Sequence, residues 1–394
     1  MSKSNIKISK LVEKIPSSGI RVFFDLVIGM KDVISLGVGE PDFVTPWNVR
    51  ERAIYAIERG YTSYTSNKGL AELRGDISRY LKRRHGLDYD EESEILITVG
   101  VSEAFDLTLR ALVSAGDKVL VPEPYYVSYG PLATLCGANP VFIKTSPENG
   151  FRVTARDINV ACDARTKALV LNYPNNPTGA SYSKKELKSI AASVIKNGLV
   201  MVSDEIYCDL TYDFEHTPFP SLPKMKERTV YLNGFSKSFA MTGWRIGYAC
   251  GPEKIISAMT KVHQYTMLCA SIISQMAAQE ALKSADRSVQ EMKREYKRRR
   301  GFVISRLNEM GLSCHMPEGA FYAFPSIKKY GLSSMAFANR LLKAEKVACV
   351  PGTAFGPSGE GYLRISYASS MDKLKEALLR MERFVKSIAG GTKC

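Results

Sequence analysis

The sequence predicts an α/β protein. Its large domain is expected to be a mostly parallel seven-stranded sheet between helices, with a smaller α+β domain beside it. Two observations support this. Between residues 94 and 251, short and continuously apolar runs are separated by longer amphipathic stretches, the pattern of strands that helices cover on both faces. The chain also has 394 residues, too many for one ordinary core and about right for two domains.

Each predicted strand of the large sheet is a short run rich in Val, Leu, Ile or Tyr. The runs are EILITVG (94–100), DKVLVPEP (117–124), NPVFIKT (139–145), KALVLNYP (167–174), LVMVSDEIY (199–207), TVYLNGF (229–235) and GYACGP (247–252). The segments SEAFDLTLRALVSAG (102–116) and KKELKSIAASVIKNG (184–198) have helical periodicity and end at glycine.

The C-terminal third has a different pattern, which predicts the second domain. One long helix is expected over Lys254–Leu282 and another over Asp286–Met310. Short strands follow in GAFYAFP, ACVPG and GYLRISYA, and further helices over Ser333–Glu345 and Asp372–Ile388. We therefore expect three parts: an N-terminal segment (1–45) that packs with the small domain, a large cofactor-binding domain (46–285) and a small domain (286–394).

The charge of the chain is strongly basic, with a formal net charge of +14. Its densest basic run, KREYKRRR at Lys293–Arg300, lies within a helical pattern, and no nucleic-acid motif accompanies it. A solvated helix face is therefore favoured over a nucleic-acid site. A basic protein also attracts small acidic metabolites, so small anions are the expected partners.

Neither a membrane nor a metal is expected as a partner. The start, MSKSNIKISK, lacks the apolar core of a secretory signal, and no apolar run reaches the length of a membrane span. The eight cysteines are scattered without a C-x-x-C pair, and there are only four histidines. Free thiols in a reducing cytoplasm are the expected state, with no zinc site or disulfide framework.

Polar residues that directly follow the predicted strands are the first candidates for a site, because ligands of such sheets bind beyond the carboxyl ends of the strands. Four strand ends supply them: Gly100-Val101-Ser102, Asn175-Asn176, Asp204-Glu205 with Tyr207, and Ser236-Lys237. The first group opens a helix, whose exposed N–H groups and positive dipole end suit a phosphate. Ser102 is equally interpreted as a helix cap.

Arg245 and three of the side chains just named have chemistry that suits a phosphorylated ring compound. Arg245, between Trp244 and Ile246, is expected to be packed and semi-buried, and thus to need an anionic partner; a surface salt bridge is the alternative. Asp204 can hold a ring nitrogen protonated, or cap a helix. Tyr207 and Asn176 can donate to a phenolate oxygen, although NYPNNPTG is also a turn sequence. With Lys237, these groups describe a pocket for pyridoxal 5′-phosphate.

Six stretches occur in the order known from one family: SLGVGEPDF, YTSNKGLAELR, PNNPTG, SDEIY, SKSFAMTGWRIGY and YLRISYA. They resemble the class I aminotransferases of fold type I, a group that includes bacterial and archaeal aspartate and aromatic aminotransferases. The resemblance covers nearly the whole chain. It implies the aspartate aminotransferase-like fold and pyridoxal 5′-phosphate as cofactor.

The resemblance also assigns the cofactor site. Lys237 matches the Schiff-base lysine, Asp204 the partner of the pyridine nitrogen, and Tyr207 with Asn176 the partners of the phenolate oxygen. The remaining cofactor-binding residues implied are Gly100, Val101, Ser102, Ser236 and Arg245 around the phosphate, and Tyr126 against the ring. Relatives often carry a serine three positions before the lysine, where this chain has Gly234, and Ser236 is expected to contribute instead.

The substrate and the partner subunit are assigned in the same way. Arg364 matches the arginine that binds the substrate α-carboxylate, with Gly39 and Asn176 beside it. Tyr64 matches a tyrosine that reaches the phosphate of the neighbouring subunit, which implies a homodimer with shared active sites.

The expected function is transfer of an amino group from an L-amino acid, aspartate or aromatic, to a 2-oxo acid, with 2-oxoglutarate as the expected acceptor, by a ping-pong mechanism. Lys237, Asp204 and Tyr207 are the expected catalytic residues. A pyridoxal-phosphate-dependent β-C–S lyase or related fold type I enzyme is the alternative. A non-catalytic cofactor-binding regulator is a third interpretation, but the residues before Gly39 are too few for the DNA-binding domain that such regulators carry.

Side-chain specificity is the least readable property. The segment Ile15–Ile20 is expected to form a lid with polar contacts from Ser17 and Ser18, and Tyr322 and the loop Tyr265–Ala270 to line the side-chain pocket. Arg110 lies two helical turns after Ser102 and so faces the same side of the helix, where it could bind a second carboxylate; a surface arginine near the C-terminal end of the helix dipole is the favoured interpretation.

Overall fold

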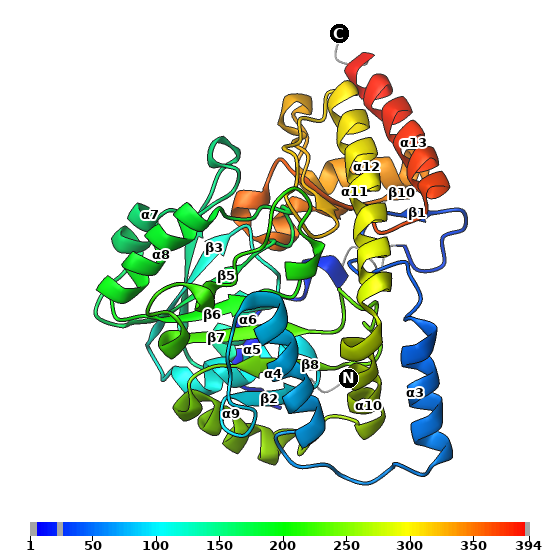
Figure 1. Ribbon diagram of the computed structural model, residues 1–394. Coiled ribbons are helices and arrows are strands. Elements are labelled where there is room, and N and C mark those ends of the chain that lie inside the picture. The colour runs from blue at the N-terminus through cyan, green and yellow to red at the C-terminus, as the bar shows by residue number, and fades with distance from the viewer. Residues whose placement is uncertain (1–5, 22–26, 391–394) are drawn as a thin grey trace.

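The computed structural model describes residues 6–21 and 27–390 and has a seven-stranded sheet at the centre of its larger unit (Figure 1). The strands are β2 (Ile95–Thr98), β3 (Lys118–Glu123), β4 (Asn139–Lys144), β5 (Thr166–Asn172), β6 (Val200–Asp204), β7 (Thr229–Gly234) and β8 (Gly247–Cys250). Their order is β2-β8-β7-β6-β5-β3-β4, and only β8 is antiparallel to its neighbours. The prediction of a mostly parallel sheet is confirmed.

Alternating side chains explain why helices cover both faces of this sheet. In β5, Ala168 and Val170 belong to one buried cluster, and Leu169 and Leu171 belong to another. The first cluster includes side chains of α5 (Gly100–Leu112), α6 (Tyr129–Leu135) and α9 (Glu253–Thr266); the second includes those of α7 (Ala155–Ala161) and α8 (Lys184–Lys196). A third cluster joins α3 (Trp47–Glu58), α4 (Ala71–His85) and α10 (Ile272–Ser284) to β2 and β8.

The prediction of a single helix over Lys254–Leu282 is wrong, because the structure has two helices there. Helix α9 ends at Thr266, and its successor α10 begins at Ile272. The carbonyl of His263 accepts the N–H groups of both Met267 and Leu268, and Leu268 has a φ of 67°. A leucine at positive φ cannot continue a right-handed helix. The apolar pattern of the sequence continues through this break, so it gave no signal for it.

The smaller unit is built from three helices around two short sheets. Strands β11 (Val350–Pro351), β12 (Leu363–Ser366) and β9 (Tyr322–Ala323) form an antiparallel sheet. Helices α11 (Asp286–Glu309), α12 (Ser334–Glu345) and α13 (Met371–Gly390) pack on it through one buried cluster. In Figure 1, α11 and α13 lie side by side at the outer edge of this unit. The predicted smaller α+β part is therefore present.

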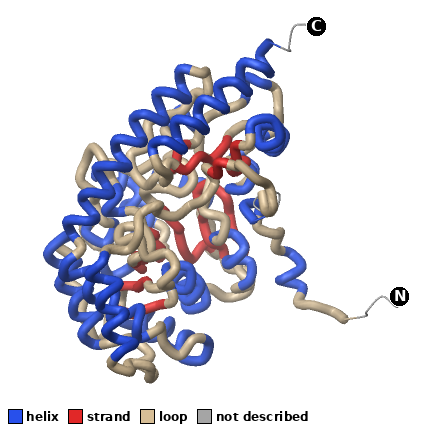
Figure 2. Tube along the Cα trace, turned by 90° about the vertical axis from the view of Figure 1, so that its right-hand side faces the viewer, coloured by secondary structure: helices blue, strands red, loops and turns tan. Residues whose placement is uncertain are grey.

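The N-terminal segment contacts both units. Strand β1 (Ile34–Ser35) pairs in parallel with β10 (Val347–Ala348) of the small unit. Further towards the N-terminus, the short helix α1 (Lys10–Lys14) contacts α6 of the large unit, and this end of the chain lies at the right-hand side of Figure 2. The pairing with β10 agrees with the expected packing of this segment on the small domain, whereas α1 packs on the large one; the division of the chain at residues 45 and 285 stays a prediction.

The basic run in α11 is solvated only in part: Lys297 and Arg298 are exposed, but the last two arginines are not. Arg299 and Arg300 are each 6% exposed. Arg299 forms an ion pair with Asp42 at 2.7 Å, and Arg300 with Asp213 at 2.6 Å. Buried guanidinium groups need such partners. Two of the cations therefore fasten α11 to the N-terminal segment and to the large unit, and are not available to a nucleic acid.

Among the described residues, no helix is long and apolar enough to cross a membrane. Seven cysteines are free thiols, and Cys394 lies outside the described residues.

Candidate active site

A cavity of about 520 Å³ lies at the carboxyl ends of the large-sheet strands, against the small unit. This volume is typical of small-molecule sites. Most of the residues predicted from sequence line it: Gly39, Val101, Ser102, Tyr126, Asn176, Asp204, Tyr207, Ser236, Lys237, Arg245, Tyr322 and Arg364. Gly100 and Tyr64 do not. Chain segments far apart in sequence therefore meet at one place.

Lys237 follows β7 and reaches into this cavity. Its Nζ donates to the carbonyl oxygen of Gly39 at 2.7 Å and lies about 6 Å from the centres of two aromatic rings, those of Tyr207 and Phe321. Burial disfavours the ammonium form and lowers the pKa of Lys237 to about 8. An amine with this pKa is substantially neutral near pH 8, which a nucleophile or a general base requires.

Asp204, at the end of β6, is a buried carboxylate. Tyr129 donates its hydroxyl to Oδ2 at 2.5 Å, and the N–H of Ile206 donates to Oδ1 at 3.2 Å. Burial nevertheless raises the pKa of Asp204 to about 6. A positive charge opposite this carboxylate would favour the ionised form again. Ionised Asp204 is therefore more stable opposite a cationic ring nitrogen than it is without a charged partner.

Arg364, on β12, brings the small unit to the cavity. It is 2% exposed, and its guanidinium lies over the rings of Tyr322 and Phe355. It donates to the Gly37 carbonyl at 2.5 Å and to Asn176 Oδ1 at 3.1 Å. Its Nε is buried without a hydrogen-bond partner among the described residues. Such an unsatisfied cation suits a carboxylate ligand.

Two tyrosines complete this side of the cavity. The hydroxyls of Tyr207 and Tyr322 are 2.8 Å apart, and Tyr322 also reaches the Gly39 carbonyl at 3.4 Å. The Asn176 oxygen is occupied by Arg364, so its amide nitrogen remains to donate. Tyr207 and Asn176 can therefore both present donors to one ligand oxygen.

The opposite end of the cavity has the features of an anion site. Helix α5 begins at Gly100, which has a φ of 76°, and the first N–H groups of a helix have no intrahelical acceptor. A Cβ on Gly100 would lie 2.6 Å from Nη2 of Arg245, so only glycine lets this guanidinium approach the turn. The helix start and Arg245 thus face the same space, with Ser102 and Ser236 on its lining.

The presence of glycine at position 234, where many relatives have serine, has a steric reason. A Cβ on Gly234 would lie 2.9 Å from the Cα of Gly247 and 3.1 Å from a methyl group of Val101. Gly247 is equally restricted, because its own Cβ would lie 2.9 Å from the Val101 nitrogen. Strands β7 and β8 therefore approach the start of α5 closely. Ser236 lines the cavity, as the expected replacement contact requires.

A family model described as aminotransferase class I and II matches residues 31–381. The chain belongs to this family. It is accordingly a transferase that moves amino groups, and its fold is that of the aspartate aminotransferases, as the motifs predicted.

Curated relatives match nearly the whole chain. The YugH protein of Bacillus subtilis (strain 168) is 54% identical over 378 residues, covering 96% of this chain and 98% of the relative. A second protein of that organism, named for N-acetyl-LL-diaminopimelate aminotransferase activity, is 47% identical and covers 94% of both chains. The aspartate aminotransferase of Pyrococcus abyssi (strain GE5 / Orsay) is 45% identical and covers 96% of this chain and 98% of the relative.

A solved structure is similar over its full length. The aromatic aminotransferase from Pyrococcus horikoshii OT3 shares 45% identity with this chain at a TM-score of 0.89, covering 93% of this chain and 99% of that one. The substrates named among these proteins differ, so membership of the family does not fix the amino donor.

The sequence reasoning missed Tyr129 and Asn172, two residues of the aminotransferase cavity that contact Asp204. Tyr129 holds Asp204, and Asn172 donates to the Asp204 carbonyl at 2.9 Å and accepts the N–H of Asn176 at the same distance. Asn172 is a polar residue at the end of an apolar strand, so the rule used for Asp204 would have found it. Tyr129 had no such signal, because one aromatic among several in PEPYYVSY is not distinguished by its sequence.

Some residues considered for the aminotransferase side-chain pocket do not line the cavity of the single chain. Ile20 is the lid residue that lines the cavity, whereas Ser17 and Ser18 are exposed and do not line it. Arg110 is 44% exposed and pairs with Asp106 at 2.7 Å, as the surface alternative predicts. The loop Tyr265–Ala270 also lies outside the cavity lining.

Arg245 differs from its prediction as well. Trp244 is half-buried and Ile246 is buried, but Arg245 itself is exposed, with a φ of 51° and a bond from Nη1 to the Thr242 carbonyl at 3.2 Å. The flanking apolar side chains turn inward and leave the arginine at the open end of the cavity. Its position fits an anionic ligand that enters from solvent.

Tyr64 is 83% exposed in the single chain and lies away from its own cavity. Its loop is nevertheless ordered by contacts with α10 and the segment before it. Asn67 donates to the Leu268 carbonyl at 2.8 Å, and Gln275 donates to Thr65 at 3.1 Å. An exposed tyrosine on an anchored loop is available to a neighbouring molecule.

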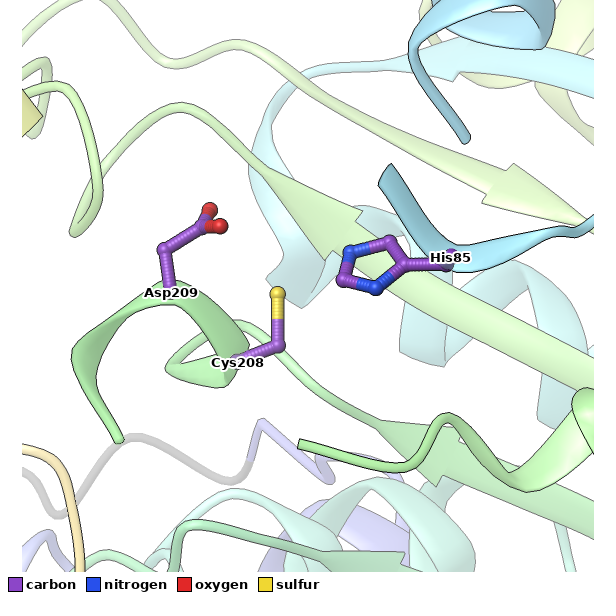
Figure 3. A group of neighbouring side chains, drawn as sticks. All are labelled: His85, Cys208 and Asp209. Atoms are coloured by element: carbon purple, nitrogen blue, oxygen red, sulfur yellow. The ribbon is translucent and has the colours of Figure 1, made fainter. Parts of the chain in front are cut away.

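One further cluster contains metal-ligating side chains. His85, Cys208 and Asp209 place their ligand atoms within 4.8 Å of one another, and Figure 3 shows the imidazole facing the other two. Tyr80 already donates to the Asp209 carboxylate, and Asn233 to the Cys208 sulfur, both at 3.2 Å. Burial raises the pKa of Cys208 well above its usual value, so it is a thiol. The carboxylate and the sulfur thus have hydrogen-bond partners in the protein, whereas Nε2 of His85 has none among the described residues, and the expectation of no metal stays a prediction.

The lowered pKa of Lys237 predicts how its reactivity depends on pH. Only the neutral amine attacks an aldehyde, so labelling of Lys237 in the cofactor-free protein should rise with pH through an inflection near 8. Exposed lysines should inflect near their usual value of about 10.4. Brief treatment with a small aldehyde and borohydride, followed by peptide mass spectrometry across pH 6–11, measures both. An inflection for Lys237 at the pH of the exposed lysines would contradict the argument from burial.

Proposed function

We propose that this aminotransferase binds pyridoxal 5′-phosphate in the cavity through Lys237 and transfers amino groups from aspartate or an aromatic amino acid to 2-oxoglutarate by a ping-pong mechanism. The observation that carries the proposal is the meeting in one cavity of a lysine of lowered pKa, a buried carboxylate and a buried arginine with an unsatisfied N–H. These three groups have different ligand preferences, and one amino acid bound beside one pyridine cofactor satisfies all of them.

The residues present fit the cofactor. Arg245 and the first N–H groups of α5 offer a phosphate site, since Gly100 leaves room for the guanidinium beside the helix start. Asp204 would hold the pyridine nitrogen, and Tyr207 with the amide nitrogen of Asn176 would hold the phenolate oxygen. The remaining contacts proposed are Val101, Ser102, Ser236 and Tyr126, all on the cavity lining. When bound, the cofactor supplies the electron sink that makes the Cα–H bond of an amino acid acidic.

The chain's own residues then perform three tasks. Arg364 binds the α-carboxylate of the substrate through the N–H groups that Gly37 and Asn176 leave free. Lys237 accepts the Cα proton at Nζ, because its lowered pKa keeps a large fraction of the amine neutral near pH 8. Asp204 holds a positive charge opposite its carboxylate, which Tyr129 orients. We propose Lys237, Asp204 and Tyr207 as the catalytic residues.

The choice of substrates is argued from charge and from the relatives. An amino donor and a 2-oxo acceptor share the α-carboxylate, so Arg364 serves both. The relatives are named for aspartate, aromatic and N-acetyl-LL-diaminopimelate transamination. A net charge of +14 favours dianions such as 2-oxoglutarate. Among the described residues that line the cavity, the cations are Lys237, Arg245 and Arg364, so a second carboxylate must find its partner elsewhere.

We propose a homodimer as the source of the missing contacts. Large apolar and aromatic side chains are exposed on α3, on the loop that follows it and at the end of α9: Trp47 at 58%, Ile57 at 59%, Tyr64 at 83% and Tyr265 at 86%. Such a surface is typical of a protein interface. A second copy seated there would bring Tyr64 to the phosphate end of the neighbouring cavity, which is open at Arg245.

The roles of Lys237 and Asp204 predict separable losses. Lys237→Ala should remove the visible absorbance of the covalently held cofactor and lower kcat by at least about 10²–10⁴-fold, the contribution of a general base. Asp204→Asn should keep the cofactor covalently held but lower kcat by about 10²–10³-fold, as when one partner of developing charge is lost. Absorbance spectra with glutamate, then with 2-oxoglutarate, follow each half-reaction. Unchanged turnover in either variant would contradict the role proposed for that residue. Release of ammonia in the absence of a 2-oxo acid acceptor would indicate a lyase.

The acceptor proposal predicts that kcat/KM for 2-oxoglutarate exceeds that for pyruvate by about tenfold, the effect of one charge-assisted hydrogen bond worth ~1.4 kcal/mol. Coupled assays with a panel of donors that includes aspartate, phenylalanine and tyrosine measure this ratio. Arg110→Ala should leave the ratio unchanged, because Arg110 pairs with Asp106 outside the cavity. A clear preference for pyruvate would refute the choice of acceptor.

Shared active sites predict complementation between two variants that are impaired in different ways, when they are assayed at a low cofactor concentration. Tyr64→Phe should weaken cofactor retention, since it removes a phosphate donor from the partner's site. Mixed with Lys237→Ala under subunit exchange, it should form heterodimers in which one site carries both lesions and the other carries neither. Activity should then exceed that of both parents. If exchange is demonstrated by mass spectrometry and activity stays at the parental level, each site is built from one chain.

A further inference from the structure

The start of α5 is fastened to α9 by a contact between the partly buried Glu103 and the buried His263, and neither residue lines the cavity. Glu103, in the first turn of α5, accepts the N–H of Val99 on Oε2 at 2.5 Å. Its other oxygen lies 2.7 Å from Nδ1 of His263, which is 0% exposed. One carboxylate thus joins the strand end that precedes the helix to a neighbouring helix.

The surroundings make this contact unusual. Helices α5 and α9 otherwise meet through apolar side chains of one cluster, such as Leu107, Ile256 and Met259, and through the weak contact of Thr108 with the Met259 sulfur. A carboxylate at the edge of such a seam costs free energy unless its oxygens are paired. Both oxygens of Glu103 are paired, and the pairing occurs at the end of the seam nearest the proposed phosphate site.

The segment that Glu103 holds is the turn that shapes the anion site. Val99 has ψ of 66° and Gly100 has φ of 76°, so the chain reverses there between β2 and α5. Thr98 donates its hydroxyl to the Gly100 carbonyl at 3.0 Å. Gly247 of β8 packs against the same turn from another side. Without Glu103, the Val99 N–H would lack the one partner that fixes it to a rigid helix.

We propose that Glu103 and His263 are positioning residues, which aim the first N–H groups of α5 at the cofactor phosphate. The proposal rests on the proposed cofactor. His263 holds the Glu103 carboxylate in one rotamer, and Glu103 holds the Val99–Gly100 turn. The amides of Val101 and Ser102 follow directly from that turn, so a looser turn presents them in several directions and binds a phosphate more weakly.

Loss of this positioning should weaken binding of the cofactor's phosphate group and leave binding of its ring unchanged. Pyridoxal and pyridoxal 5′-phosphate share the ring and the aldehyde, and only the second has the group that α5 would bind. Loss of the Glu103–His263 pair should therefore reduce the advantage of pyridoxal 5′-phosphate over pyridoxal. A pair that merely tethers two helices would lower stability and affect both ligands alike.

The experiment measures dissociation constants of both ligands for cofactor-free protein, by absorbance with dialysis, together with competition by inorganic phosphate. Glu103→Ala should reduce the ratio of the two constants about tenfold and weaken phosphate competition similarly, with pyridoxal binding unchanged. Glu103→Gln keeps an acceptor for Val99 and should restore the ratio to within about threefold. His263→Leu should behave like Glu103→Ala, and His263→Asn, which keeps a donor near Nδ1, like Glu103→Gln.

Asp106→Ala is the matched control, since it removes a carboxylate one turn along the same helix that pairs with Arg110 and not with the turn. Its ratio should equal that of the unaltered protein. An unchanged ratio in Glu103→Ala and His263→Leu, with lower thermal stability alone, would overturn the positioning role, as would failure of all four variants to fold. If the unaltered protein itself shows no preference for pyridoxal 5′-phosphate, the proposed cofactor fails, and this inference with it.

Discussion

Lys237, Asp204 and Arg364 line one cavity, and none of the three forms an ion pair within the described residues. Lys237, Asp204 and Arg364 each meet neutral partners instead: a carbonyl, a hydroxyl and an amide oxygen. Removing unpaired charges from water is costly, and the altered pKa values of Lys237 and Asp204 are its direct sign. The rest of the molecule maintains this arrangement, which becomes favourable when ligands supply the missing charges.

The two units of the fold contribute different parts of this arrangement. The large sheet delivers Asp204 and Lys237 from the ends of neighbouring strands, where parallel strands bring their polar residues to one edge. The small unit delivers Arg364 from β12, and the N-terminal segment delivers the backbone carbonyls of Gly37 and Gly39. Because β1 pairs with β10, the segment that carries these carbonyls is attached to the unit that carries Arg364.

Crowding is the second constraint on the site. Glycines at positions 100, 234 and 247 let two strands, a helix start and a guanidinium approach within contact distance. A side chain at any of them would push apart groups that must converge on one anion. The Glu103–His263 pair fixes the same region from the other side of the helix. Small residues and a paired carboxylate thus give the turn one conformation.

The sequence by itself determined the strand runs, the helices that cover them and the family, because period, apolar content and short motifs are local properties of the chain. It also named many of the residues that line the cavity, some because polar residues after apolar strands converge on one edge and others because short motifs resemble those of the family. It did not reveal the break in the helix near Leu268, where the apolar pattern continues while the backbone does not. Nor did it reveal that Arg299 and Arg300 are buried, because their ion-pair partners, Asp42 and Asp213, are distant in the sequence.

Only the tertiary structure decided which groups meet. Tyr129 and Asp204 lie 75 positions apart, and Glu103 and His263 lie 160 apart. Contacts of this kind depend on how helices pack across a sheet, which no local pattern encodes. The same reason separates Arg364 from Arg110: both are arginines with plausible neighbours in sequence, but one is buried with an unsatisfied N–H in the cavity, and the other is paired at the surface. Burial, and with it the shift in pKa and the free energy of an unpaired charge, is set by the packed chain as a whole.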